Sequence, residues 1–224
     1  MSALRLALLS LALLVLAAGA AAAQPADAGF HASARVGMTA FETPTVRDRE
    51  GAGLLGYDRR GTTWSVSAGH EWRVARFLFI GIEVGYTDNG QATITYASAN
   101  AYAFRSTQVD VLASATVAAG KFRVGLKAGI GRTREQYRIS TYISGTPDLN
   151  SERARDLPVA ALTLGYAVTK RLSVFVDARR TFGDVADTVT KALIASNPTP
   201  PPYRDVLNSV SRVTAFSAGV KIRI

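Results

Sequence analysis

The sequence holds few side chains that could do acid–base or metal chemistry near neutral pH. It has two histidines, His31 and His70, and no cysteine. The absence of cysteine excludes disulfides, thiolate metal sites and thiol nucleophiles. Two histidines without closely spaced carboxylates make a poor metal site, because protein-bound zinc takes three or four protein ligands. We therefore expect neither a metal nor another cofactor.

Charged side chains are the second possible source of function. The 26 Lys and Arg residues outnumber the 17 Asp and Glu residues, so the formal net charge is +9. The basic residues alternate with apolar ones and do not form runs. Because nucleic-acid binding uses a clustered basic face, we expect no nucleic-acid partner.

The alternation of apolar and polar residues predicts the elements that carry these charges. In the stretch FLFIGIEVGYTD, which begins at Phe77, the even-numbered residues from Leu78 to Tyr86 are apolar, and the odd-numbered ones include Gly81 and Glu83. A period of two is typical of a β-strand with one apolar face. The pattern recurs in residues 30–40, 64–72, 109–117, 122–130, 160–168, 172–178 and 216–224. The sequence therefore predicts eight strands, most of them about ten residues long.

The connections between the predicted strands alternate strictly between short and long. The short ones lie around residues 74–76, 119–120 and 169–171, and the long polar ones around 42–61, 87–104, 140–156 and 182–211. Outer-membrane barrels have short periplasmic turns and long extracellular loops. We therefore predict an all-β fold, an eight-stranded antiparallel up-and-down transmembrane β-barrel, as one domain over residues 24–224.

The first 23 residues have the composition of a secretory signal peptide. A short polar start with Arg5 is followed by a long apolar run, which ends in Ala21-Ala22-Ala23 before Gln24. A small-residue A-x-A ending followed by a polar segment favours cleavage. We expect cleavage after Ala23 and export to a bacterial envelope.

The orientation of the two strand faces separates a membrane barrel from a soluble one. A soluble lipid-binding barrel has an apolar lumen, whereas a membrane barrel turns its apolar face to lipid. The polar face of the predicted strands combines glycines with long charged side chains, and glycines leave room for such side chains in a narrow interior. We therefore predict that this face lines the lumen. The predicted lumen charge network consists of Arg35, Glu71, Glu83, Asp110, Arg123, Lys127, Asp177, Arg179, Lys221 and Arg223.

Asp110 and Lys127 are the predicted ion pair within this network. Folding the chain about residues 119–120 places Leu112 opposite Lys127, so that Asp110 becomes a diagonal neighbour of Lys127 on the same face. Eight strands enclose a lumen barely wide enough for side chains. The main prediction is a static polar core, and the alternative is a narrow non-specific porin-like channel. A soluble periplasmic lipid-binding barrel is a further alternative.

Aromatic residues mark the predicted limits of the membrane. Trp64 and Trp72 are eight residues apart on one strand, which corresponds to about 20 Å after allowance for strand tilt. This distance is close to the height of the apolar band of an outer-membrane barrel. We predict two aromatic girdles that contain Trp64, Trp72, Tyr86 and Tyr166.

The signal peptide, the eight strands and the terminal stretch TAFSAGVKIRI resemble the eight-stranded outer-membrane barrels of the OmpA transmembrane domain and OmpX type. The resemblance implies a location in the bacterial outer membrane and recognition by the outer-membrane assembly machinery. It also implies that Phe216, Val220, Ile222 and Ile224 form the C-terminal insertion signal, although Ile224 stands where the family most often has an aromatic residue. No peptidoglycan-binding domain is expected.

Some small outer-membrane barrels modify lipid A, which requires a histidine with a serine near the outer leaflet or the loops. Here both His31 and His70 fall at the predicted periplasmic end. We therefore expect no enzymatic activity.

The long loops are the predicted site of partner-specific function. Basic residues make the outer rim positive, which predicts electrostatic contact with lipopolysaccharide phosphates. The alternative is a solvated rim of mixed charge, because acidic residues are interspersed among the basic ones. The predicted contact residues are Arg47, Arg49, Arg59, Arg60, Arg132, Arg134, Arg138, Arg153 and Arg155. The expected role is structural, lipopolysaccharide-contacting or adhesive, with an extracellular partner as a further expectation.

Overall fold

The computed structural model describes residues 28–42, 54–58, 60–96, 101–140, 149–183 and 210–224. The predicted signal peptide and most of the first and fourth long loops lie outside these residues. No helix within the described part of the chain is long and apolar enough to span a membrane.

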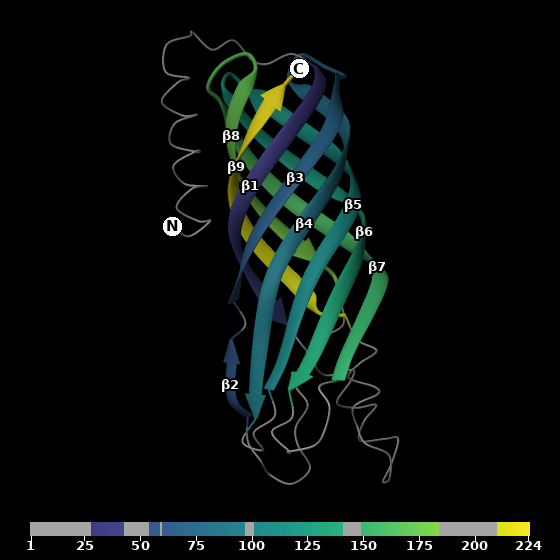
Figure 1. Cartoon of the computed structure of the whole chain (residues 1–224). Helices are drawn as coiled ribbons and strands as arrows, with labels where there is room; N and C mark the ends of the chain where they lie inside the picture. The colour runs from purple at the N-terminus through teal and green to yellow at the C-terminus, as the bar shows by residue number, and fades with distance from the viewer. Residues whose placement is uncertain (1–27, 43–53, 59, 97–100, 141–148, 184–209) are drawn as a thin grey trace.

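The described residues form one antiparallel sheet that closes on itself (Figure 1). Its strands are β1 (Gly29–Glu42), β2 (Leu54–Asp58), β3 (Arg60–Arg73), β4 (Leu78–Tyr96), β5 (Ala101–Ala119), β6 (Phe122–Ser140), β7 (Leu149–Ala167), β8 (Leu172–Thr181) and β9 (Arg212–Arg223). Consecutive barrel strands pair with each other, and β1 pairs with β9 to close the ring. The short strand β2 pairs with β4 alone and extends the sheet beyond the barrel wall. The predicted eight-stranded up-and-down barrel is confirmed.

The two ends of the barrel differ in the length of their connections. The short turns and the C-terminus lie at one end, and the strands from β4 to β7 project beyond the wall at the other (Figure 1). Each of these four strands has 19 residues. At the short-turn end, Thr169 Oγ1 accepts backbone hydrogen bonds from Arg171 (3.1 Å) and Leu172 (2.9 Å), which closes the turn between β7 and β8.

The turn between β5 and β6 lies one residue later in the sequence than predicted. Ala119 pairs with Phe122, so that the turn consists of Gly120 and Lys121 and not of residues 119–120. Gly120 has a φ of 61°, a backbone conformation that glycine adopts at little cost. The register is therefore shifted by two residues, and Ser114, not Leu112, lies opposite Lys127.

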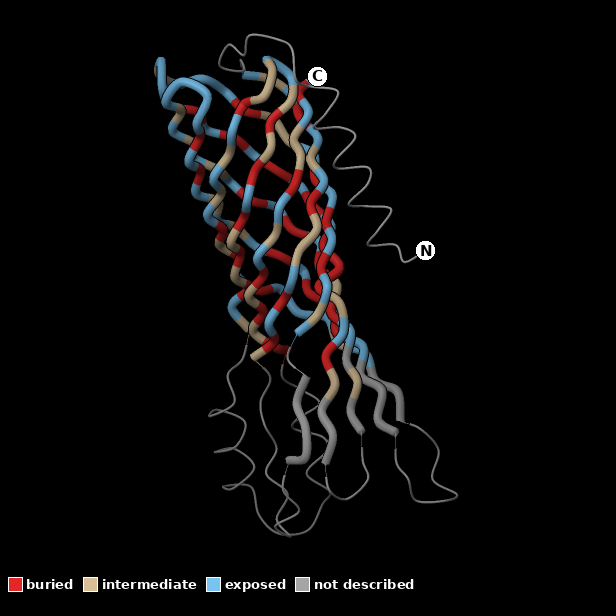
Figure 2. Tube along the Cα trace, turned by 90° about the vertical axis from the view of Figure 1, so that its left-hand side faces the viewer, coloured by how far each residue is buried: buried red, intermediate tan, exposed pale blue. Residues whose placement is uncertain are grey.

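Apolar side chains face outward along the barrel and polar ones face inward. The exposed side chains include Ile82, Val111 and Leu126, and Leu126 is 64% exposed. The inward positions between them are buried, so that the two classes alternate along each strand (Figure 2). An exposed apolar belt around a charged lumen fits lipid and not water. The soluble barrel with an apolar lumen is therefore wrong for this chain.

Candidate functional site in the lumen and at the rim

The middle of the lumen is occupied by two buried arginine–aspartate pairs. Arg35 on β1 lies 3.4 Å from Asp177 on β8. Arg179, two residues after Asp177, donates to Asp110 on β5 at 2.5 Å and to the Gln108 side-chain oxygen at 3.3 Å. Alternating residues of one strand point to the same side, so Asp177 and Arg179 reach different neighbours from one face of β8. These contacts link the strands across the lumen.

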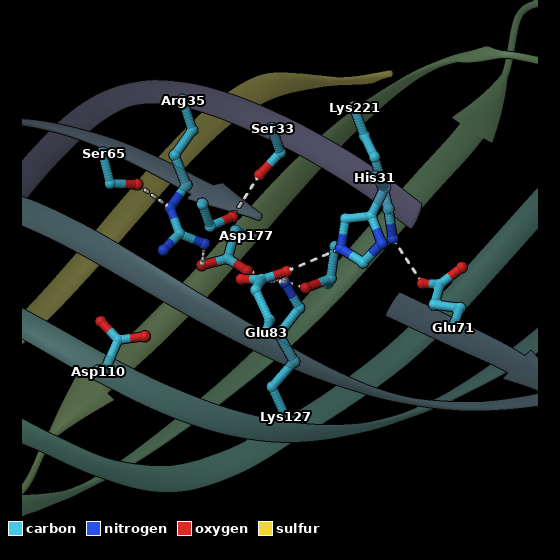
Figure 3. A network of polar contacts seen from close by, with 12 residues as sticks. His31, Ser33, Arg35, Ser65, Glu71, Glu83, Asp110, Lys127, Asp177 and Lys221 are labelled. Carbon is cyan, nitrogen blue, oxygen red and sulfur yellow. Dashed lines mark hydrogen bonds and ion pairs between the residues drawn. The ribbon is translucent and has the colours of Figure 1, made fainter. Parts of the chain in front are cut away.

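Lys127 has a different partner from the one we predicted. Its Nζ donates to both carboxylate oxygens of Glu83, at 3.0 and 2.8 Å, and Figure 3 shows the two side chains meeting across the lumen. His31 Nε2 lies 3.5 Å from the same carboxylate. The predicted Asp110–Lys127 pair is therefore wrong: the two-residue register shift moves Lys127 away from Asp110, and Arg179 takes that place.

A third group of charges lies at the short-turn end of the lumen. The carboxylate of Glu71 on β3 accepts hydrogen bonds from Lys221 (2.5 Å), Arg223 (2.6 Å) and Arg123 (3.4 Å). The Arg123 guanidinium also lies 4.7 Å from the ring centre of Phe79, a buried aromatic residue on β4. All ten residues of the predicted lumen charge network therefore lie on the inner face, within these three groups.

The lumen also contains an apolar layer at its long-loop end, which we did not predict from the sequence. Phe41, Leu157, Val159 and Val213 are buried on the inner faces of β1, β7 and β9. Phe41 continues the period of two that starts on Arg35 of β1, and Val213 continues the one that starts on Lys221 of β9, whereas β7 carries no residue of the predicted charge network. On β1 and β9 the inward face can therefore be followed along the sequence to Phe41 and Val213, although the predicted lumen set included charged residues alone.

The four predicted girdle residues occupy the two ends of the apolar belt. Trp64 and Tyr86 contact each other toward the long-loop end, with ring centres 5.4 Å apart. At the short-turn end Tyr166 contacts Phe122 at 5.2 Å. Trp72, eight residues along β3 from Trp64, also lies at the short-turn end. A membrane-interface role for these rings remains a prediction.

Arginines surround the outer surface at the long-loop end. We call Arg60, Arg105, Arg132, Arg134, Arg180 and Arg212 the arginine collar. Each lies two or four residues beyond an outward apolar residue of its own strand, for example Arg60 and Trp64, or Arg212 and Phe216. This even spacing places the collar on the outer face, just beyond the apolar belt.

Carboxylates partly neutralise the collar. Arg132 lies 3.2 Å from Asp156, and Arg134 lies 2.8 Å from Glu152. The Glu42 carboxylate forms ion pairs with two arginines, Arg180 and Arg212, with an N–O distance of 3.3 Å to each.

Arg105 adds a further ion pair, with Asp88. The hydrogen bond to Asp88, together with its charge, raises the pKa of Arg105.

The collar overlaps only in part with the predicted lipopolysaccharide contacts. Arg60, Arg132 and Arg134 belong to both sets. Arg153 and Arg155 lie at inward positions of β7, and Arg138 lies on β6 with its side chain outside the described part. Arg47, Arg49 and Arg59 lie outside the described residues. Arg105, Arg180 and Arg212 were not predicted, because the basic contacts were expected in loops and not at strand ends.

The OmpA-like transmembrane domain model matches residues 25–212 of the sequence. The chain belongs to this family. Its barrel resembles Neisserial surface protein A, with 17% identity and a TM-score of 0.50 over 88% of this chain and 97% of that one. Two further structures are similar. Ail of Yersinia pestis has 10% sequence identity and a TM-score of 0.43 over 88% of this chain and 99% of that one. OprG of Pseudomonas aeruginosa has 10% sequence identity and a TM-score of 0.48 over 91% of this chain and 99% of that one. No curated protein matches the sequence.

Membership of the OmpA-like family orients the barrel in the bacterial outer membrane. The short-turn end faces the periplasm, and the long-loop end faces outward. The residues of the predicted insertion signal, Phe216, Val220, Ile222 and Ile224, alternate with inward residues along β9 and the chain end. They are thus available on the lipid-facing surface.

Both histidines of this OmpA-like barrel lie at the periplasmic end. His31 is buried in the lumen, in space that Gly69 leaves free: a Cβ on Gly69 would lie 2.9 Å from the imidazole. His70 faces outward between the rings of Phe30 (4.6 Å) and Trp72 (4.5 Å). The described residues contain no group of three or more His, Asp and Glu that could hold a metal ion.

Proposed function

We propose that this OmpA-like protein is a structural outer-membrane barrel that binds lipopolysaccharide through its arginine collar. The observation that carries the proposal is the position of the collar, on the outer face and just beyond the apolar belt. Phosphate groups of lipopolysaccharide lie at this level in the outer leaflet. Guanidinium groups bind phosphate with charge-assisted, often bidentate hydrogen bonds.

The charge balance of the collar supports this ligand. Its arginines outnumber the carboxylates Glu42, Asp88, Glu152 and Asp156. Exposed ion pairs contribute little stability and exchange easily with other partners. Arg132 and Arg134, whose ion pairs are exposed, thus remain available to phosphate, while the surplus positive charge of the collar attracts an anionic surface.

The lumen favours a structural role over transport. Ion pairs fill the middle of the lumen. The apolar layer of Phe41, Leu157, Val159 and Val213 lies between these ion pairs and the long-loop end of the barrel. The outward face of β9 supports recognition by the outer-membrane assembly machinery, as the family resemblance implies. The adhesive role that we predicted depends on loops that lie largely outside the described residues.

A double substitution tests the lipopolysaccharide contact. The Arg132→Gln/Arg134→Gln variant removes two adjacent collar charges and two exposed ion pairs. We expect lipopolysaccharide to raise the temperature at which the folded barrel loses its fast mobility in SDS gels, and the rise to be clearly smaller for the variant. Arg171→Gln, an exposed arginine at the periplasmic end, is the matched control and should respond like the parent. Equal stabilisation of all three proteins by lipopolysaccharide would argue against the proposal.

A further inference from the structure

Within the described residues, cations outnumber carboxylates at the periplasmic end of the lumen. We call Glu71, Arg123, Lys221 and Arg223 the periplasmic cluster. Its three cations share the carboxylate of Glu71. The N–O distances are 3.4 Å for Arg123, 2.5 Å for Lys221 and 2.6 Å for Arg223. In the middle of the lumen, by contrast, Arg35, Lys127 and Arg179 each have a carboxylate of their own. The periplasmic cluster therefore carries a surplus of two positive charges.

Arg223 has hydrogen-bond donors that no acceptor in this cluster satisfies. The side chain is 7% exposed, and its Nη2 donates to Glu71. Its Nε and Nη1 are buried and have no hydrogen-bond partner within the described part of the chain. Both Glu71 oxygens are already taken, Oε1 by Lys221 and Oε2 by Arg223 and Arg123. Buried donors are normally satisfied, so these N–H groups call for an acceptor that Glu71 cannot supply.

The cluster lies at the periplasmic end of the barrel wall. Glu71 is two residues from the end of β3, Arg123 is the second residue of β6, and Arg223 is the last residue of β9. Lys221 keeps 18% of its side chain exposed. Next to the cluster, the exposed Arg73 places its guanidinium 5.4 Å from the ring centre of Phe79, the ring that Arg123 also covers.

We propose that the periplasmic cluster is a binding site for a phosphate group. A phosphate dianion would neutralise the surplus of two positive charges. Its several oxygens would accept hydrogen bonds from Arg223 Nε and Nη1 while Lys221 supplies a point charge. Two sources supply a phosphate group at the periplasmic face: free phosphate, and the headgroup of an inner-leaflet phospholipid, whose phosphodiester carries one negative charge and would neutralise half of the surplus. The site is separate from the arginine collar, which lies at the opposite end of the barrel.

Equilibrium dialysis of inorganic phosphate against the refolded mature barrel in a non-ionic detergent tests the site. Ionic strength is held constant with chloride, so that general screening does not change. We expect saturable binding of one phosphate per barrel. Arg223→Gln and Lys221→Gln should each weaken it about tenfold or more, because each removes a charged donor. Arg171→Gln removes an exposed charge at the same end and should leave binding unchanged.

Glu71→Gln gives a prediction of the opposite sign. It removes the carboxylate that competes with phosphate for the same donors, so phosphate should bind more tightly to this variant. This opposite effect keeps the proposal testable if Arg223→Gln fails to fold. A heat-dependent gel shift checks folding of every variant.

A second arm separates the two sources of phosphate. Phosphatidylglycerol is added to the micelles, and the lipid phosphorus retained per barrel is measured after size-exclusion chromatography. Retention that depends on Arg223 and Lys221 without binding of inorganic phosphate would support the site and assign it to a lipid headgroup. The proposal is overturned if neither probe shows saturable binding, or if binding is the same in Arg223→Gln, Lys221→Gln and the parent.

Discussion

Glu83 illustrates how single side chains hold the interior of this barrel together. It lies on β4, and its carboxylate binds Lys127 from β6 and approaches His31 from β1. A charge inside a protein is tolerated when a partner of opposite sign and hydrogen bonds replace the lost water. The same holds for Asp110 with Arg179. The stability of the lumen therefore depends on complete pairs and not on single residues.

Glu83→Gln should destabilise the barrel because it leaves Lys127 without its carboxylate. Breaking one side of a buried ion pair costs about 3 kcal/mol. Urea unfolding in phospholipid vesicles, followed by the fluorescence of Trp64 and Trp72, measures the change. The double variant Glu83→Gln/Lys127→Met removes both charges and should recover part of the loss. A double variant that is as unstable as the sum of its single variants would contradict this account of the pair.

At the scale of the strands, small residues determine how closely neighbours can approach. Gly219 on β9 lies between Arg35 on β1 and Phe175 on β8. A Cβ at Gly219 would come within 2.7 Å of the Arg35 Cβ and 2.9 Å of the Phe175 ring. Gly120 differs, because its turn is open and a Cβ there would have no atom within 4 Å.

Gly219→Ala and Gly120→Asn should therefore have different effects. The first overpacks a filled lumen and should cost about 1–3 kcal/mol of unfolding free energy. The second keeps a residue type that tolerates positive φ in an open turn, and should cost well under about 1 kcal/mol. Urea unfolding of both variants in the same vesicles gives the comparison. Equal destabilisation would show that lumen packing does not explain the need for glycine at position 219.

At the scale of the whole molecule, three layers fill the lumen from one end to the other. The periplasmic cluster is followed by the ion pairs of Glu83, Asp110 and Asp177, and then by the apolar layer that contains Phe41 and Leu157. Ions crossing this path would have to separate buried ion pairs and pass the buried apolar side chains Phe41, Leu157, Val159 and Val213. Both steps oppose conduction.

Planar-bilayer recordings of the folded barrel should show no conductance steps above background. The protein is first shown to be folded by its heat-dependent gel mobility, and an open porin added to the same bilayer checks the recording. Reproducible discrete steps from the folded protein would reject the static lumen and favour the narrow-channel alternative.

The sequence by itself determined the barrel, its strand number and the inward face. All three follow from local chemistry: a period of two assigns residues such as Ile82 and Glu83 to opposite faces, and the alternation of short and long connections orders the strands. The partners of the lumen charges were decided by the tertiary structure, because they depend on the register of several strands at once. A two-residue error at Gly120 was enough to pair Asp110 with Lys127 in place of Arg179. The surplus charge around Glu71 depends in the same way on β3, β6 and β9 meeting at one end of the closed sheet.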